Sequence, residues 1–356
     1  MSVGTSATEV SGVTPEVQRK RGCLFYIRRT LKWFVIVLFG IIVLGVVYQT
    51  VATELDKRSY APRGELYPVN GHQIHITCIG EGSPAVILQA GGVAESLWWY
   101  WIQQQVAEHT QVCAYDRPGL GWSQPASGPR DARTINTELS ALLEQAGIPA
   151  PYVMVGHSYG AILTRVFAAQ YPDKVEGLVL VDSALLIPRL FADQAEFDEW
   201  RRSNDILQAF IWGMTRTGIM RLIMPGTFQQ WGYPPEIVSE LAALRSPNSV
   251  FDADYAERIP EMWALQQASA SAENLGDLPT AVLWASDLSG FVATDEALQT
   301  FFTYRDAVAS YSGNSVVRMI EGADHGSILG NEQYAQQVTD AILDVIQAAQ
   351  TGAPLE

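Results

Sequence analysis

The sequence predicts an α/β fold, a mostly parallel sheet flanked by helices, preceded by one membrane-spanning helix. Three observations carry this prediction. Short apolar runs bounded by glycine alternate with helical patterns along most of the chain, which is typical of strands joined by helical crossovers. A helical, tryptophan-rich stretch at about 183–278 interrupts this alternation, because it is longer than a simple crossover requires. An uncharged apolar stretch occupies residues 33–53.

The composition describes a chain that buries a large core. It has 356 residues, of which 48% are hydrophobic and 17% charged, which argues against persistent disorder. Residues 1–58 hold 8 basic and 4 acidic side chains, a net charge of +4, whereas the rest holds 15 basic and 34 acidic ones, a net charge of −19. Since such an acidic body repels phosphate backbones, we expect no nucleic-acid partner.

The chain begins with a basic tail, residues 1–32, followed by the apolar stretch 33–53. At about 1.5 Å per residue, 21 helical residues span the ~30 Å hydrocarbon layer of a bilayer. Basic residues precede the stretch and acidic ones follow it, so the positive-inside bias predicts a cytoplasmic N-terminus and an extracytoplasmic body in the cell membrane. The alternatives are a buried core helix and a cleavable signal peptide. An all-round apolar surface disfavours the first, and the long basic tail disfavours the second.

A linker, residues 54–63, leads into a domain at residues 64–356 that holds the alternating pattern. Helical patterns at 134–146 and 161–170 lie between short apolar runs, so crossovers and a largely parallel sheet are expected. Strands of this kind are buried on both faces and read as continuously apolar. The runs that we interpret as strands are residues 75–79, 85–88, 112–115, 152–155, 178–181, 281–284 and 316–320.

One strand end carries the pattern of a nucleophile. The run at 152–155 leads into Gly156-His157-Ser158-Tyr159-Gly160 and then into a helical pattern. Glycines on both sides of the serine permit a very tight turn, and the following helix directs its N-terminal dipole at developing negative charge. We interpret Ser158 as the nucleophile of a glycine-x-serine-x-glycine elbow. A structural turn serine is the alternative, which the strand–turn–helix setting disfavours.

On these residues the chain resembles the alpha/beta-hydrolase superfamily, in its lidded esterase and lipase-like branch, over about residues 64–349. The run 88–92 is similar to the oxyanion segment of that family. Residues 115–123 resemble its turn after the fourth strand, in which we expect Arg117 to pair locally. Residues 322–326 resemble its histidine loop. The resemblance implies an eight-stranded, mostly parallel sheet with a helical lid inserted after the sixth strand.

The resemblance also assigns the oxyanion donors, the backbone N–H groups of Tyr159 and Gly92. Gly92 has no side chain and leaves room for a substrate. The alternative is that the backbone N–H of Val93, and not that of Gly92, is the donor. The sequence departs from the family at two positions: Ala90 stands where a histidine is frequent, and Ala161 replaces a second glycine after the elbow. Neither change removes a reacting group.

A serine hydroxyl needs a base within hydrogen-bond reach, and histidine is the usual one. Of the five histidines, His325 alone follows Ser158 in the family's chain order of serine, acid and histidine. His157 is adjacent to the serine, and its side chain is expected to point elsewhere. We therefore predict that His325 is the base; a loop histidine that only packs is the alternative.

Two aspartates at strand ends compete for the role of the acid that holds the imidazole. Asp287 follows the run 281–284, where the superfamily most often places its acid, and we rank it first. Its local sequence is one residue shorter than the family's usual pattern. Asp182 follows the run 178–181 and is the alternative, because some relatives donate the acid from there.

The lid segment, residues 183–278, is rich in tryptophan and methionine, and a second aromatic run at 98–101 follows the oxyanion segment. Walls of large apolar side chains favour a neutral, hydrophobic substrate, and we expect Trp98 and Trp212 to line the substrate pocket. Lid aromatics that face the bilayer are the alternative.

The sequence contains no metal-ligand spacing, phosphate-binding glycine loop or dinucleotide fingerprint, so we expect no metal and no cofactor. Cys78 and Cys113 lie on strands that are neighbours in the superfamily's usual order. An outward compartment permits a disulfide between them, but we expect two buried thiols.

Together these features predict a membrane-anchored serine hydrolase that cleaves a neutral, hydrophobic carboxylic ester through an acyl-enzyme. Epoxide hydrolases and haloalkane dehalogenases of the family use aspartate where this chain has Ser158, which argues against their reactions. Serine-dependent cleavage of a lactone, an amide or a carbon–carbon bond stays open. A second open hypothesis is that the chain is an inactive binding protein that keeps the fold.

Overall fold

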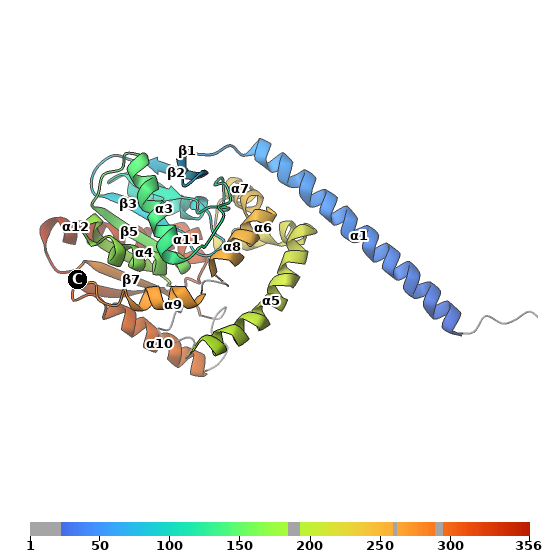
Figure 1. The fold of residues 1–356 in the computed structure, drawn as a ribbon. Coiled ribbons are helices and arrows are strands. Elements are labelled where there is room, and N and C mark those ends of the chain that lie inside the picture. Colours follow the sequence, from blue (N-terminus) through green and yellow to red (C-terminus); the bar gives the residue numbers. More distant parts are fainter. Residues whose placement is uncertain (1–22, 184–192, 259–261, 289–294) are drawn as a thin grey trace, which may run out of the picture. The chain divides into compact units, whose positions relative to one another are not determined.

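The computed structural model describes residues 23–183, 193–258, 262–288 and 295–356 (Figure 1). The chain divides into two compact units, residues 1–44 and 45–356. Helix α1 (Cys23–Ser59) contributes to both units. The sheet and the remaining helices belong to the second unit.

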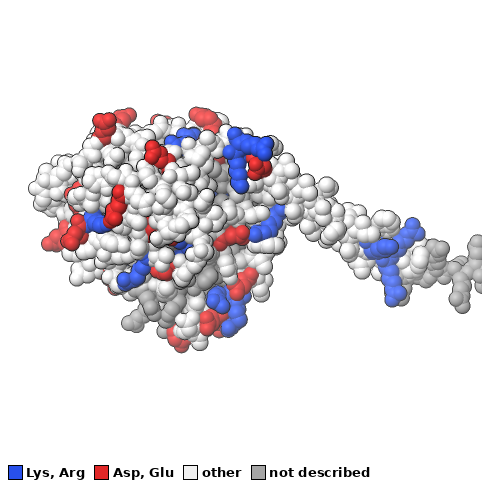
Figure 2. Space-filling model, turned by 45° about the horizontal axis from the view of Figure 1, so that its top comes forward, with Lys and Arg blue, Asp and Glu red and all other residues white. Residues whose placement is uncertain are grey.

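Helix α1 is longer than the predicted span, and the predicted linker 54–63 is helical as far as Ser59. By length and composition, its residues Phe25–Ser59 suffice to cross a membrane. The side chains of Arg28, Arg29 and Lys32 lie near its beginning, and the helix that follows them is white over most of its length in Figure 2. The described part of α1 thus separates basic from apolar residues as the sequence indicates.

Eight strands form one sheet with the order β1-β2-β4-β3-β5-β6-β7-β8. Strands β1 and β2 pair antiparallel, as do β2 and β4, and all other neighbours are parallel. The predicted eight-stranded, mostly parallel sheet is therefore confirmed. The strands are β1 (Glu65–Val69), β2 (His72–Ile79), β3 (Ala85–Gln89), β4 (Val112–Tyr115), β5 (Tyr152–His157), β6 (Val175–Val181), β7 (Thr280–Ala285) and β8 (Ser315–Ile320).

The seven apolar runs of the sequence all lie in strands, and β1 is the strand whose position the pattern did not reveal. Most of its side chains are exposed or half-buried, and it contains Pro68. Proline lacks a backbone N–H and is tolerated at a sheet edge, which is where β1 lies. An edge strand of this kind has no continuous apolar run, because water covers part of it.

Helices cover both faces of the sheet (Figure 1). On one face, α2 and α12 pack against alternate residues of the central strands, such as Val155 and Val179. The intervening residues, such as Met154 and Leu180, contact α3, α4 and α10 on the other face. The last helical pattern of the sequence therefore packs on the sheet as expected. These helices are α2 (Tyr100–Ala107), α3 (Ala132–Gln145), α4 (Tyr159–Gln170), α10 (Asp295–Ala309) and α12 (Glu332–Thr351).

The lid segment lies between β6 and β7, after the sixth strand. Its described residues are helical over most of their length, whereas residues 184–192 and 259–261 lie outside the described part of the chain. The helices are α5 (Gln194–Arg216), α6 (Ile219–Trp231), α7 (Pro235–Arg245), α8 (Asn248–Arg258) and α9 (Met262–Ala270). Elsewhere in the described residues, the short helices are η1 (Ser96–Trp99), η2 (Pro172–Lys174) and α11 (Ser327–Gly330).

The expectation of two buried thiols is wrong. Cys78 and Cys113 are directly opposite each other on the antiparallel strands β2 and β4, and their sulfur atoms form a disulfide. Their Cα atoms are 4.1 Å apart. Residues that face each other across an antiparallel pair come this close, so the register brings the two sulfurs into bonding range. Cys78 is moreover exposed, since it lies where β2 approaches its end.

Candidate active site

Ser158 lies at a sharp turn between β5 and α4. Its backbone has φ 55° and ψ −120°, a conformation that a non-glycine residue adopts only at a cost in strain. The surrounding sheet holds it there: the Ser158 N–H donates to the carbonyl of Val181 at the end of β6, at 3.0 Å. The structure therefore contains the strand–turn–helix elbow that the sequence indicates.

The glycines of the elbow are required by close backbone approach. A Cβ on Gly160 would lie 2.1 Å from the carbonyl oxygen of Gln89 at the end of β3, and one on Gly156 would lie 2.3 Å from the carbonyl oxygen of Gly160. Real Cβ atoms do not come this near to other heavy atoms. Because both positions lack a side chain, the helix can begin directly against the strand and raise Ser158 at the sheet edge.

His325 and Asp182 form a hydrogen-bonded pair. His325 Nδ1 lies 2.5 Å from Asp182 Oδ2, and a carboxylate at this position accepts the Nδ1 proton. The imidazole then presents Nε2 as a proton acceptor. Asp182 is 7% exposed, and its other oxygen accepts from the backbone N–H of Ala285 at 3.1 Å. The pair is therefore fixed at the carboxyl ends of β6 and β7.

This pair lies beside the elbow. The Ser158 N–H is bonded to the residue directly before Asp182. On the other side, His157 Nε2 donates to the backbone carbonyl of His325 at 3.0 Å, and the two imidazole ring centres are 4.5 Å apart. Val181 and His157, which directly precede Asp182 and Ser158 in the chain, thus link the aspartate, the serine and the histidine loop.

Asp287 is the aspartate that we ranked first, and the hydrogen bond described for it involves its backbone. Its backbone N–H donates to the carbonyl of Ala323 at 2.8 Å, which ties the end of β7 to the histidine loop. The hydrogen bonding to Nδ1 favours Asp182, the alternative, as the acid. Local sequence could not distinguish the two, because both follow strands whose carboxyl ends lie side by side in the sheet.

His157 has a role that the sequence did not reveal. Its side chain is 1% exposed and supports the backbone of His325. Burial lowers the pKa of His157 well below its usual value of 6.5, and the neighbouring His325 lowers it further. A neutral imidazole that donates from Nε2 holds the histidine loop without adding a charge.

The loop after β3 passes directly beside Ser158, as the resemblance implies. A Cβ on Gly91 would lie 3.1 Å from the Cβ of Ser158. Gly92 lies in the turn that follows, and Val93 has φ 54°. On the opposite side of the elbow, Tyr159 is the first residue of α4, and the N–H groups of a first helical turn point out of the helix.

Arg117 anchors this loop, where we had expected only local pairing. Its guanidinium donates to the carbonyls of Ala90 at 2.6 Å and Gly91 at 2.7 Å, and to the carboxylate of Glu257 on α8 at 2.9 Å. All these groups come from distant parts of the sequence. A buried charge is tolerated when it is paired and hydrogen-bonded in this way, so Arg117 connects the oxyanion loop with the lid segment.

A buried carboxyl group follows the oxyanion loop. Glu95 is fully buried, and burial raises its pKa to about 8, although the positive charge of Arg245 acts in the opposite direction. Glu95 is therefore mostly protonated at neutral pH.

The two tryptophans predicted to line the substrate pocket lie in different surroundings. Trp98 is 6% exposed and packs in an aromatic cluster with Phe228 and Trp231 of α6, at ring-centre distances of 5.7 and 5.2 Å. Its ring centre is 6.4 Å from that of His157. This cluster brings α6 against the elbow, so Trp98 supports the site from within the core.

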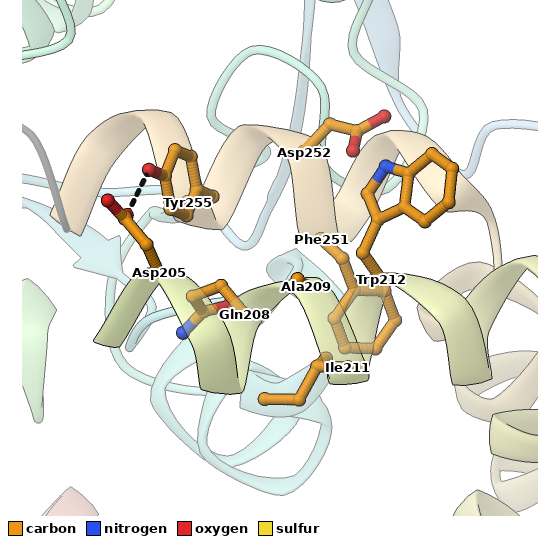
Figure 3. Close-up of a pocket in the computed structure, with 8 residues that line it drawn as sticks. All are labelled: Asp205, Gln208, Ala209, Ile211, Trp212, Phe251, Asp252 and Tyr255. Atoms are coloured by element: carbon orange, nitrogen blue, oxygen red, sulfur yellow. Dashed lines mark hydrogen bonds between the residues drawn. The ribbon is translucent and has the colours of Figure 1, made fainter. Parts of the chain in front are cut away.

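Trp212 lines a cavity of about 470 Å³ between α5 and α8 (Figure 3). Aliphatic and aromatic side chains form part of its wall, and the Tyr255 hydroxyl donates to Asp205 at 2.7 Å. Neither Ser158 nor His325 is among the residues that line it. Trp212 thus borders a space within the lid segment.

Comparison with known proteins agrees with this architecture. The family model of the alpha/beta hydrolase fold matches residues 84–287, more than half of the chain. A protein of Gibberella zeae named AB hydrolase superfamily protein is 38% identical over 104 residues, which are 28% of this chain and 32% of that protein. Pimeloyl-[acyl-carrier protein] methyl ester esterase of Shewanella oneidensis is 29% identical over 113 residues, 32% of this chain and 40% of that protein.

The chain thus spans less than half the length of these curated relatives. Among solved structures, that of the epoxide hydrolase CorEH without ligand is 20% identical, with a TM-score of 0.60, and covers 80% of this chain and 98% of its own. At this identity the likeness concerns the fold. The matched region contains β3 to β7 with the elbow, the oxyanion loop and Asp182. The chain therefore belongs to the alpha/beta hydrolase family.

Proposed function

We propose that this hydrolase cleaves a carboxylic ester, with Ser158 as nucleophile, His325 as base and Asp182 as acid. The observation that carries the proposal is the hydrogen bond from His325 Nδ1 to Asp182, formed beside a serine held in a strained elbow. A base oriented by a carboxylate next to a serine is the arrangement that nucleophilic acyl transfer requires.

The reaction follows from these positions. His325 Nε2 takes the proton of the Ser158 hydroxyl as its Oγ attacks the carbonyl carbon, and Asp182 stabilises the imidazolium. Backbone N–H groups of Tyr159 and of the turn at Gly92 donate hydrogen bonds to the oxyanion that develops on the carbonyl oxygen. His325 then gives its proton to the leaving alkoxide, an alcohol departs, and an acyl-enzyme is left.

The second half of the reaction uses the same groups. His325 removes a proton from a water molecule, the hydroxide attacks the acyl carbon, and the Ser158 oxygen leaves with the proton from His325. The products are a carboxylic acid and the free enzyme. A neutral hydrophobic ester is the substrate class that we favour, because Trp231 of the lid segment packs on Trp98, which lies beside His157 of the elbow.

We further propose that α1 crosses the cell membrane once and that the body faces the extracytoplasmic side. The basic residues at the beginning of α1 support a cytoplasmic N-terminus. The disulfide between Cys78 and Cys113 supports an oxidising compartment for the body. A yeast protein that is 27% identical over 183 residues is named an uncharacterized vacuolar membrane protein, which agrees with a membrane location.

The test is the Ser158→Ala variant of the full chain in detergent, assayed with an activated short-chain acyl ester. We expect kcat to fall by about 10³-fold or more, because removing the nucleophile abolishes the covalent route. A fluorophosphonate probe should label the parent and not the variant. An unchanged thermal midpoint shows that the variant is folded, and turnover at the parent rate in a folded variant would refute the assignment.

A further inference from the structure

The lid segment carries an exposed apolar surface around the corner between α5 and α6. The exposed fractions of its six large apolar side chains lie between 42% and 77%. We call it the apolar lid face, and it consists of Ile206, Leu207, Phe210, Ile219, Leu222 and Ile223. Such a concentration of exposed apolar side chains marks an interaction surface.

The rest of the described body is different. Beyond α1 and the apolar lid face, the exposed large apolar side chains of the described residues are Leu66, Ile79, Trp212, Phe302, Val317 and Met319. Trp212 borders the cavity of Figure 3, and the other five are exposed by 37% to 43% and come from four different elements. Exposed apolar surface on the body is therefore concentrated at one corner.

The spacing shows that this face belongs to regular helix sides. Residues 206, 207 and 210 follow one side of α5, and residues 219, 222 and 223 follow one side of α6. The buried side chains of the same helices lie at other positions: Phe197, Thr215 and Phe228. Each helix thus has an apolar side directed away from the core, which a helix on an aqueous surface does not need.

The last turns of α1 hold this corner in place, within the compact unit 45–356. A Cβ on Gly45 would lie 2.7 Å from the carbonyl oxygen of Thr217. One on Gly218 would lie 2.8 Å from the ring of Tyr48. The corner therefore packs directly against the part of α1 that contains Gly45 and Tyr48.

Hydrogen bonds reinforce this packing. The guanidinium of Arg221 donates to Gln49 Oε1 at 2.8 Å and to Thr53 Oγ1 at 2.7 Å, and it pairs with Asp56. Gln49 in turn donates to the carbonyl of Ser246 at 2.7 Å. From Gly45 to Asp56, about three turns of α1 are thus tied to the lid segment.

These contacts fix the depth of the corner relative to the apolar stretch. Gly45 and Tyr48 belong to the uncharged residues 33–53. Since Gly45 precedes Thr53 by eight residues at about 1.5 Å each, the corner lies ~12 Å inside the end of that stretch. If α1 crosses a bilayer, the apolar lid face lies within the outer leaflet, on the hydrocarbon side of the headgroup boundary.

The charges around the corner agree with this position. From residue 206 to residue 231 the only charged side chains are Arg216 and Arg221, and both are basic. The remainder of the body has a strong excess of acidic residues. Arg216 pairs with Asp252 of α8, and Arg221 pairs with Asp56 of α1. The corner thus presents apolar side chains with its few charges paired, which fits the outer part of a lipid leaflet.

We propose that the apolar lid face is inserted into the outer leaflet of the membrane that α1 crosses, so that its occupant is lipid. This inference rests on the proposed function and narrows its substrate class. The substrate is then an ester that resides in the bilayer and reaches Ser158 from the membrane side of the lid segment. A soluble short-chain ester bypasses this route.

The insertion is tested on the full chain in phospholipid nanodiscs, without using activity. In a Cys23→Ser background, Leu222→Cys carries a bimane label, and Gln337→Cys on the exposed side of α12 is the matched control. Doxyl-labelled lipid should quench the label at 222 at least about twofold more than the label at 337, and aqueous iodide should show the opposite order.

Two outcomes overturn the proposal. Equal access of iodide to both labels means that the face is in water. Protection of position 222 from both quenchers, together with chemical crosslinking of two copies through it, means that a second copy covers the face. The quenching measurement does not depend on activity and should give the same result in a Ser158→Ala background. It therefore tests the insertion even if the proposed function is wrong.

A kinetic comparison tests the substrate route. Leu222→Asp places a carboxylate on the apolar lid face, and Phe302→Asp makes the same kind of change on an exposed position of α10. We expect Leu222→Asp to lower kcat/KM for a bilayer-dispersed long-chain ester about tenfold, with the value for a soluble short-chain ester unchanged. Equal effects of the two variants would overturn the route. Absence of both activities in the parent chain would instead contradict the proposed function.

Discussion

At the scale of single residues, Asp182 shows how strongly one side chain is positioned. Its φ of 42° lies in the left-handed region, which a non-glycine residue occupies at a cost of about 1–2 kcal/mol. Its N–H donates to Leu283, one oxygen accepts from Ala285, and the other binds His325. Three bonds to two other elements maintain the unfavourable backbone conformation, which directs the carboxylate at the imidazole.

This predicts different results for the two candidate acids. Asp182→Asn should lower kcat for an activated ester by about 10²–10⁴-fold, because an amide neither stabilises the imidazolium nor selects the required tautomer. Asp287→Asn is the matched control and should change kcat by less than about threefold. The thermal midpoint of each variant checks folding. A larger loss for Asp287→Asn than for Asp182→Asn would show that our assignment of the acid is wrong.

At the scale of elements, the disulfide fastens the antiparallel part of the sheet. Strand β2 pairs with β1 on one side and with β4 on the other. Its pairing with β4 is antiparallel, in a sheet whose central strands are parallel. Cys78 and Cys113 are 35 residues apart in the chain, so the bond closes a loop that contains β3 and α2.

A loop of this length predicts a measurable stabilisation. The chain-entropy estimate for about 36 residues gives ~3–4 kcal/mol at 25 °C. Replacing both cysteines by alanine should lower the free energy of unfolding by about this amount, with kcat nearly unchanged because neither residue contacts the candidate triad. Denaturant unfolding of parent and double variant, both without reductant, measures the difference. Equal stability would show that the bond does not form in the folded protein.

At the scale of the whole molecule, the charge is unevenly distributed along the chain. The first 58 residues have a net charge of +4, and the remainder has a net charge of −19. Basic residues before a membrane span are retained on the cytoplasmic side. The anionic cytoplasmic leaflet attracts the basic tail and repels an acidic body, so charge and disulfide favour the same orientation.

The orientation is tested in spheroplasts of a bacterial host that expresses the full chain. Protease added from outside should digest the body and leave a short membrane-bound fragment that contains the N-terminal tail. An epitope at the N-terminus should be protected until the cells are lysed. A body that resists protease in intact spheroplasts and is digested only after lysis would contradict the proposed orientation.

Much of the site was predictable from the sequence because its signals are local. The elbow at Ser158 needs glycines at fixed neighbouring positions, and the histidine loop has its own short pattern. Continuous apolar runs revealed the strands that are buried on both faces, whereas β1, partly exposed at the sheet edge, has no such run. Each of these predictions depends on residues that are close together in the chain.

The tertiary structure decided what depends on register and distant contacts. Asp182 and Asp287 follow equally apolar strands, and only the arrangement of β6, β7 and the histidine loop shows that His325 Nδ1 contacts Asp182. The disulfide required the pairing register of β2 with β4. Arg117 reaches the oxyanion loop and α8 across long intervals of sequence. Local patterns specify backbone conformation, whereas hydrogen bonds between distant side chains depend on how whole elements pack.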